Sequence, residues 1–244
     1  MFVGLGTVIN IGTIVLGSTL GILGGARFPE KLRTQITDIL GCVTLINAAD
    51  NLRSIWAPAF LSAVPRGWTI LGTLAALIVG GAVGYLLRIE GRLESFGLQI
   101  KARFGTRDQG SFLAGFMAAS LLFAIGPLAI LGSISDGMHT GIAQLVLKST
   151  LDGFAAIAFA ATFGWGVAFS AIPVGIYQLV WTAIGYFLGN ILSAYQVQSL
   201  NAVGGVLLFG IGLRLLNIKF IAVGDLLPAL IFAPLVALAA HQFI

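Results

Sequence analysis

The sequence predicts an all-α membrane protein, a polytopic bundle of about eight transmembrane helices. Hydrophobic residues make up 58% of the 244 residues and charged residues only 9%. Soluble domains usually carry about 25% charged residues, because much of their surface faces water. The mean hydropathy is +1.01, so the chain needs an apolar solvent. Because no polar stretch is long enough to form a separate soluble domain, we expect one integral membrane domain over residues 1–244.

Eight segments are apolar enough to be spanning helices, each of which needs about 20 residues. The second is the weakest because it is short and polar, and the eighth contains two prolines, which predicts a kink. The N-terminus lacks the basic region and cleavage site of a signal peptide, so the first segment is expected to be retained. The segments are 3–24, 35–50, 67–87, 111–131, 140–163, 166–189, 199–216 and 220–240.

One long polar connector, residues 88–110, interrupts the apolar segments. Its apolar residues Leu93, Phe96, Ile100 and Phe104 recur every three or four positions. This spacing predicts an amphipathic helix on the cytoplasmic membrane surface. The Pro-containing segment 51–66 is expected to be a loop near the membrane interface.

Lysine and arginine predict the orientation, because they are enriched in cytoplasmic loops. With both termini outside, ten of these residues lie inside and only Arg53 and Arg66 lie outside. The ten are Arg27, Lys31, Arg33, Arg88, Arg92, Lys101, Arg103, Arg107, Arg214 and Lys219. We therefore predict N-out and C-out, which requires an even number of spans.

Glycines at four-residue spacing predict close helix packing, since small residues let helix backbones approach in lipid. Gly17, Gly21 and Gly25 share a face of the first segment, Gly80 and Gly84 one of the third, and Gly185 and Gly189 one of the sixth.

A weak internal repeat relates residues 35–52 to 199–216. The alignment superposes Gly41 on Gly205 and Leu52 on Leu216, and the same offset superposes Gly21 on Gly185. The related helices run in opposite directions in the predicted topology, as in the inverted repeats of secondary transporters. Chance similarity between hydrophobic helices is the alternative.

Two local features stand out between residues 120 and 153. Gly126-Pro127 breaks an apolar helix, because proline lacks the backbone donor and clashes with the preceding turn. The break is either a simple kink or a hinge beside a cavity. A Ser-x-x-Asp-Gly motif occurs twice, from Ser133 to Gly137 and from Ser149 to Gly153. For Asp136, a local turn or cap is the main alternative to a ligand-binding role.

The strongest functional signal is a polar stripe, Gln144, Lys148 and Asp152, spaced by four on an otherwise apolar helix. Ionisable groups within a membrane are costly and seldom face lipid. In one interpretation Lys148 and Asp152 form a purely structural pair. In the other, Asp152 responds to a proton or cation, Lys148 tunes it, and a substrate cation displaces the lysine. The substrate-binding candidates are Asp152, Lys148, Ser149, Gln144, Asn10, Asn47, Asp136 and Ser133.

Asn10 and Asn47 offer neutral oxygen ligands suited to a hard cation, or simple interhelical hydrogen bonds. We expect them to line a cavity at membrane depth with Lys148 and Asp152. One cysteine and two distant histidines argue against a Cys- or His-rich metal site,. No cofactor or nucleic-acid partner is expected. The bilayer is the main partner, and a homo-oligomer is compatible with the sequence.

Seven stretches spread along the chain carry specific motifs: residues 6–10, 17–21, 126–137, 148–160, 166–173, 202–216 and 226–230. They resemble the YqgA-like family of bacterial inner-membrane proteins, a domain of unknown function. The resemblance covers nearly the whole chain and implies a multi-pass inner-membrane protein without an established activity. STLDGFAAIAFA, followed by GGVLLFGIGLRLL, is also distantly similar to small manganese and amino-acid exporters.

Two classes of function are compatible with this sequence. The favoured one is a secondary transporter of a small solute or cation, working by alternating access. The alternative is a non-transport scaffold or signalling component that binds a partner through residues 88–110. An enzyme is not expected, because HExxH, GxSxG, Asp–Asp protease and P-loop patterns are all missing from the sequence,.

Overall fold

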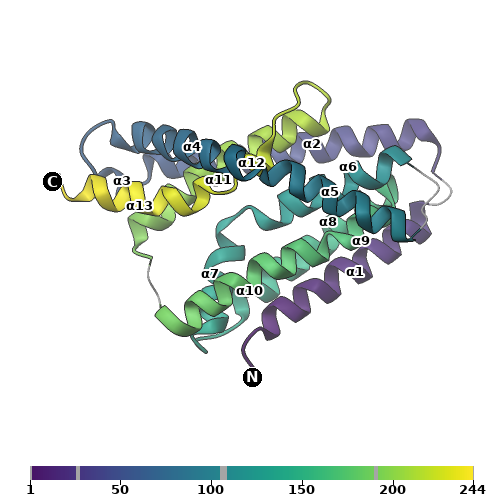
Figure 1. Cartoon of the computed structure of the whole chain (residues 1–244), viewed down its shortest axis with the longest axis horizontal. Helices are drawn as coiled ribbons and strands as arrows, with labels where there is room; N and C mark the ends of the chain where they lie inside the picture. Colours follow the sequence, from purple (N-terminus) through teal and green to yellow (C-terminus); the bar gives the residue numbers. More distant parts are fainter. Residues whose placement is uncertain (1, 26–27, 105–108, 190–191, 244) are drawn as a thin grey trace. The chain divides into compact units, whose positions relative to one another are not determined.

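The computed structural model describes residues 2–25, 28–104, 109–189 and 192–243, and every regular element within these ranges is helical (Figure 1). All eight apolar segments contain helices, as expected. The elements are α1 (Leu5–Gly25), α2 (Glu30–Leu52), η1 (Arg53–Trp56), α3 (Pro58–Leu61), α4 (Trp68–Leu87), α5 (Ile89–Phe104), α6 (Gln109–Ala124), α7 (Pro127–Gly137), α8 (Ala143–Phe163), α9 (Trp165–Phe169), α10 (Ala171–Leu188), α11 (Ala194–Leu215), α12 (Val223–Leu226) and α13 (Ala229–His241).

The chain forms two compact units that alternate along the sequence. The first unit contains residues 1–40 and 93–191, and the second unit contains residues 41–92 and 192–244. Helices α2 and α5 carry the chain from one unit to the other. Each unit is described separately below.

Six helical segments of the described chain are long and apolar enough to cross a membrane. They are α1, α4, α8, Trp165–Leu188, α11 and Val223–His241. A seventh consists of the bent pair Ser111–Ala124 and Pro127–Gly137. Helix α2 is equally long but carries five charged residues and is not among these spans. The six or seven candidate spans are roughly consistent with the predicted number of about eight.

The bent pair α6–α7 is one broken span of the first unit. Its start lies at one end of that unit, because an added Cβ at Gly166, in α9, would meet the Phe112 carbonyl oxygen. Its end lies at the other, where the Asp136 carboxylate accepts hydrogen bonds from the first residues of α1. The helices bend by 61° at Gly126, whose φ of 139° suits glycine,. Pro127 then starts α7,. The predicted break is therefore present, and helix continues beyond residue 131 to Gly137.

Glycines bring α1 and α8 into backbone contact, as their spacing predicted. An added Cβ would meet the Gly153 carbonyl oxygen at Gly17, that of Ile157 at Gly21 and that of Ala161 at Gly25. Both residue numbers rise together along this contact, so the two helices are parallel. Their close approach fixes which face of α8 is turned toward α1.

In the second unit, α2 and α11 make a reciprocal contact at the positions that the repeat alignment pairs. A Cβ at Gly41 would lie 2.7 Å from Leu216, and one at Gly205 would lie 2.9 Å from Leu52. The repeat alignment superposes Gly41 on Gly205 and Leu52 on Leu216, so it converts one of these contacts into the other. Two inverted copies facing each other across an approximate two-fold axis make contacts of this kind.

Helix α5 occupies the predicted amphipathic connector and packs its apolar face on its own chain. Ile100 is buried in a cluster with Phe112, Phe116 and Met117, and Leu93 packs against it. The Phe104 ring packs against that of Phe169 in a tilted arrangement, with 4.9 Å between the ring centroids. Leu93 and Ile100 of the face expected to meet lipid are therefore used within the first unit, whereas Phe96 and Phe104 stay exposed.

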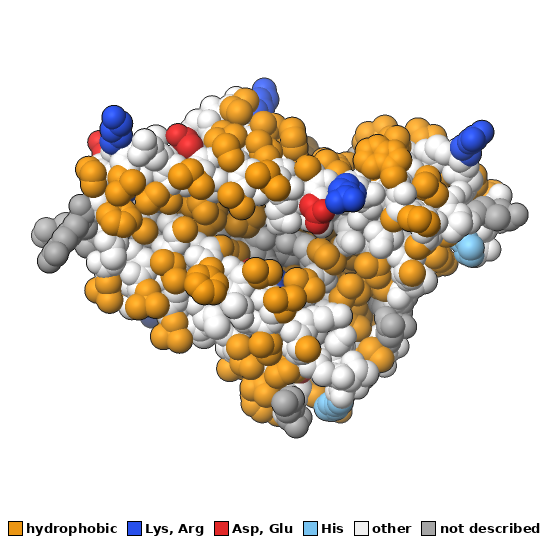
Figure 2. All heavy atoms as spheres, turned by 180° about the vertical axis from the view of Figure 1, so that it is seen from behind, with side chains coloured by type: hydrophobic (Ala, Val, Ile, Leu, Met, Phe, Trp, Pro, Cys, Tyr) orange, Lys and Arg blue, Asp and Glu red, His pale blue; other side chains and the backbone are white. Residues whose placement is uncertain are grey.

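The outer surface of the helices is apolar. Figure 2 shows hydrophobic side chains over much of the visible face, with charged side chains at only a few points. On α1, Leu16, Leu20 and Leu23 are 60–71% exposed, whereas Thr7, Asn10 and Ser18 on the opposite face are fully buried. This arrangement of polar residues inside and apolar residues outside matches a lipid environment.

Candidate functional site

The first unit has a buried ion pair at its centre. Nζ of Lys148 contacts the carboxylate of Asp152 one turn further along α8. Their side chains are only 7% and 11% exposed. Asn10, on α1, donates a hydrogen bond from Nδ2 to Oδ2 of Asp152 at 3.1 Å. Lys148 and Asp152 of the predicted stripe therefore form, with Asn10, a three-residue site that joins two helices.

Local and tertiary features together build this site. Residues four apart share a helix face, so Lys148 and Asp152 meet without further help. The glycine contacts turn that face toward α1, where Asn10 lies. A buried charge that loses its partner is strongly destabilising, which explains why the two charges occur together.

The remaining serine and glutamine candidates do not join the ion pair. Ser149 and Ser133 are buried, but their hydroxyls donate to the carbonyl oxygens of Leu145 and Ala129 in their own helices. Gln144 is exposed in the first turn of α8. The expected stripe of three is thus a buried pair preceded by an exposed glutamine.

Asn47 is exposed on the part of α2 that belongs to the second unit. Its Oδ1 accepts a hydrogen bond from Asn51 at 3.1 Å. No described contact assigns it to the expected cavity.

Asp136 caps a different helix from its own. Its two carboxylate oxygens accept hydrogen bonds from the backbone N–H groups of Gly4, at 3.3 Å, and Gly6, at 3.0 Å. The positive end of the α1 dipole favours an anion there. The alternative expected from the sequence was a cap of a nearby turn or helix. Asp136 does act as a cap, but the helix that it caps starts about 130 residues earlier in the chain.

The second unit contains a charged cluster that the residue pattern along the chain does not predict. Glu90 binds Arg214 at 2.6 Å and accepts a hydrogen bond from the Gly224 N–H, also at 2.6 Å. The Glu90 N–H donates to Asp225 at 2.9 Å, and Arg214 lies over the Phe220 ring. The cluster ties the α4–α5 junction to the end of α11 and the start of α12. In the sequence, the signal for this cluster was Arg214, a charged residue in the last turn of an otherwise apolar helix.

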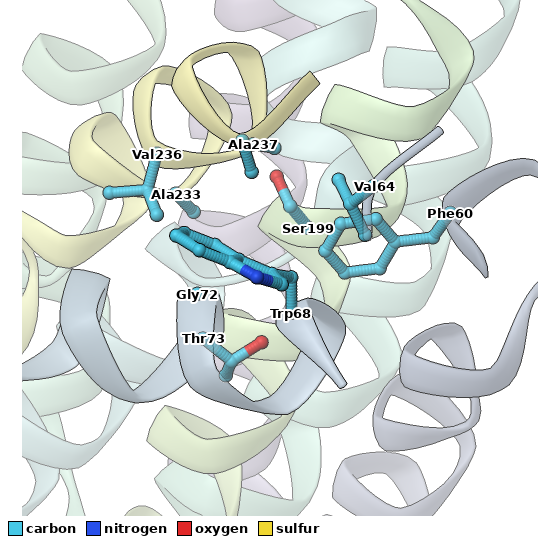
Figure 3. A pocket seen from close by; sticks show the side chains of 10 residues that line it. Phe60, Val64, Trp68, Gly72, Thr73, Ser199, Ala233, Val236 and Ala237 are labelled. Carbon is cyan, nitrogen blue, oxygen red and sulfur yellow. The ribbon is translucent and has the colours of Figure 1, made fainter. Parts of the chain in front are cut away.

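A small pocket in the second unit lies between α4 and α13. Figure 3 shows the Trp68 side chain near Gly72 and Ala233, with Thr73 and Ser199 close by. The space open to the centre of a water molecule is about 10 Å³, room for at most one water. Both hydroxyls donate to carbonyl oxygens of their own helices. We interpret this pocket as a packing gap.

Residues that could hold a metal are sparse. Within the described ranges, no three His, Cys, Asp or Glu side chains lie together as a metal-binding group. Sites for hard cations usually gather several oxygen ligands. The Asp152 site has one carboxylate, which already contacts an ammonium group.

The fold and the buried polar sites define a multi-pass α-helical membrane protein. The chain belongs to the DUF554 family, described as "Protein of unknown function (DUF554)", whose profile matches residues 5–238. It is 30% identical over 234 residues to the uncharacterized protein YqgA of Escherichia coli (strain K12), covering 94% of each chain. It is 27% identical over 238 residues to the uncharacterized membrane protein YdfK of Bacillus subtilis (strain 168), covering 98% of this chain and 97% of that one. No solved structure matches, and the distant likeness to exporters stays a prediction.

Proposed function

We propose that this protein is a secondary transporter that moves a small solute or cation across the bacterial inner membrane by alternating access. The observation that carries the proposal is the buried Lys148–Asp152 pair, held by Asn10 among membrane-spanning helices. Charges at such depth are costly and commonly mark substrate or ion pathways. In this proposal Asp152 binds the substrate or a proton, and Lys148 balances its charge when the site is empty.

Two features of the fold support a moving site. The broken span α6–α7 offers a hinge at Gly126–Pro127, within the same unit as the ion pair. The reciprocal glycine contacts of α2 and α11 support the inverted repeat that many transporters use for alternating access. The proposed orientation is N-out and C-out.

The scaffold alternative has less support. It required the apolar face of α5 as a partner-binding surface, yet Leu93 and Ile100 already pack against α6. We therefore retain transport as the proposal.

The test is uptake by proteoliposomes that contain the purified full-length protein. They are supplied with a ¹³C-labelled small-molecule extract and a mixture of metal salts, and their contents are measured by mass spectrometry. We expect a solute that accumulates with the wild-type protein and not with Asp152→Asn. Asp50→Asn is the matched control, since Asp50 forms an exposed ion pair with Arg53. Uptake that is equal for wild type and Asp152→Asn would contradict the role of Asp152.

A further inference from the structure

Gln178 is the most unusual uncharged residue in the first unit. It lies in the middle of α10 and is fully buried. Within the described protein atoms, neither its Oε1 nor its Nε2 has a hydrogen-bond partner. A buried amide without partners is costly, and such groups are normally paired with protein or ordered water. Water or a ligand is therefore the expected partner of Gln178.

The packing of α10 against α1 sets the depth of Gln178. A Cβ at Gly4 would lie 3.4 Å from Leu179, and one at Gly175 would lie 2.6 Å from Ile11. Residue numbers rise along α1 as they fall along α10, so these helices are antiparallel. Gln178 therefore lies between the depths of Gly4 and Ile11.

The same stretch of α1 carries two further polar atoms without partners. Thr7 and Asn10 are fully buried, and Thr7 Oγ1 and Asn10 Oδ1 have no hydrogen-bond partner among the described atoms. Asn10 uses its Nδ2 to hold Asp152. Unpaired donors and acceptors from α1 and α10 thus share one layer with the ion pair.

The charge of this layer selects the kind of ligand. Lys148 and Asp152 cancel, and the Asp136 carboxylate is bound by the Gly4 and Gly6 N–H groups at the start of α1. The other polar groups are neutral amides and hydroxyls. A bare divalent cation would lie near the lysine ammonium with a single carboxylate to bind it, which is a poor site for a hard cation. Amides and hydroxyls both donate and accept hydrogen bonds, so they suit a solute that does the same.

We propose that Gln178, Thr7 and Asn10 line a hydrated pocket beside the ion pair, and that this pocket binds a small polar solute without net charge. The solute carries hydrogen-bond donors and acceptors, and either a neutral molecule or a zwitterion meets this description. The inference rests on the proposed function only in taking this bound solute to be the transported one.

Cysteine labelling of the full-length protein in membranes tests the pocket. The only native cysteine, Cys42, is first replaced by serine, and Gln178→Cys is then labelled with N-ethylmaleimide. Thiols react as thiolates, which need a polar surrounding. Leu207→Cys, buried in the second unit, and Ile176→Cys, 58% exposed on the outer face of α10, are the controls. We expect labelling at residue 178 to be at least about tenfold faster than at either control.

Thr182→Cys is a second reporter, because Thr182 is also buried with an unpartnered hydroxyl. Gel filtration of each variant checks that it folds. Equally slow labelling at residues 178, 182 and 207 in folded protein would overturn the hydrated pocket.

Ligand protection tests the class of solute. The probes are manganese chloride and three fractions of the cell extract, separated by ion exchange into cationic, anionic and uncharged solutes. Slower labelling of residue 178 with the uncharged fraction supports the proposal. Protection by manganese or a charged fraction alone overturns it, and so does protection by none of the probes. Protection without uptake by proteoliposomes would instead reject transport while keeping the binding pocket.

Discussion

Replacing Lys148 by methionine leaves Asp152 buried without its cationic partner. The two side chains are 7% and 11% exposed, so water can replace little of the lost interaction. At a contact distance of about 3 Å and an effective dielectric constant of about 20, the attraction between the charges is on the order of 5 kcal/mol. Desolvation offsets part of it, and the hydrogen bond from Asn10 to Asp152 remains.

We therefore expect Lys148→Met to lower the free energy of unfolding by about 3 kcal/mol, the low end for breaking a buried ion pair. Asp152→Leu leaves Lys148 unpaired and is expected to cost about as much. The double variant removes both charges and should cost no more than about 3 kcal/mol, because it leaves no buried charge without a partner. The expected coupling energy is thus at least about 3 kcal/mol.

The measurement is equilibrium unfolding by SDS in mixed micelles, followed by the fluorescence of the four tryptophans. The exposed pair Arg53–Asp50, with side chains 82% and 75% exposed, is the matched control. Its double-variant cycle should give less than about 1 kcal/mol. Additive losses at Lys148 and Asp152, or a coupling as small as in the control, would refute the buried pair.

Three further outcomes are expected. Gly21→Ala should lose about 2 kcal/mol in the same unfolding assay, because its Cβ would meet a backbone carbonyl,. Gly12→Ala, with nothing within 4 Å, should lose nothing and gain up to about 1 kcal/mol; equal effects would contradict the α1–α8 contact. Glu90→Gln should cost about 2 kcal/mol, since it weakens charged hydrogen bonds to Arg214 and Gly224,. Its control, the exposed Glu94→Gln, should change little, and a similar loss there would argue against the cluster. Alkaline phosphatase fused to the C-terminus should be active and a fused green fluorescent protein dark; the reverse result would overturn the C-out prediction.

Much of the fold follows from patterns along the chain. Apolar length predicted the spanning helices, and glycine spacing predicted the tight face of α1, because both depend on residues close in sequence. The Gly126–Pro127 break was predictable for the same reason. The continuation of the broken span from residue 131 to Gly137 was not predictable. It depends on the packing of α7 against α10, which no local pattern reveals.

The candidate site was predictable only in part. Lys148 and Asp152 are one helical turn apart, so their pairing needed nothing but the helix. Gln144 has the same spacing, yet it is exposed in the first turn of α8, where Leu145 is the side chain buried against α1 and α7. Glu90 and Arg214 were missed because 124 residues separate them, and only the fold brings them together.

Asp136 shows the same division. Its place at a helix end favoured a cap, but a carboxylate caps whichever helix start the packing brings to it. Here that start is α1, whose Gly4 and Gly6 N–H groups lack partners within their own helix,.

The sequence alone determined that this chain is a membrane protein, that it is helical, and that it carries two opposite charges one turn apart in an apolar helix. Composition and local spacing suffice for these statements, since lipid excludes unpaired backbone and most charge. Only the tertiary structure decided which neighbour each buried face meets. A helix that is apolar on every side can present any face to its neighbour, and the glycine contacts of α1 and α8 select the one that brings Asn10 to Asp152. The packing of α10 against α1 likewise brings Gln178 to the same depth.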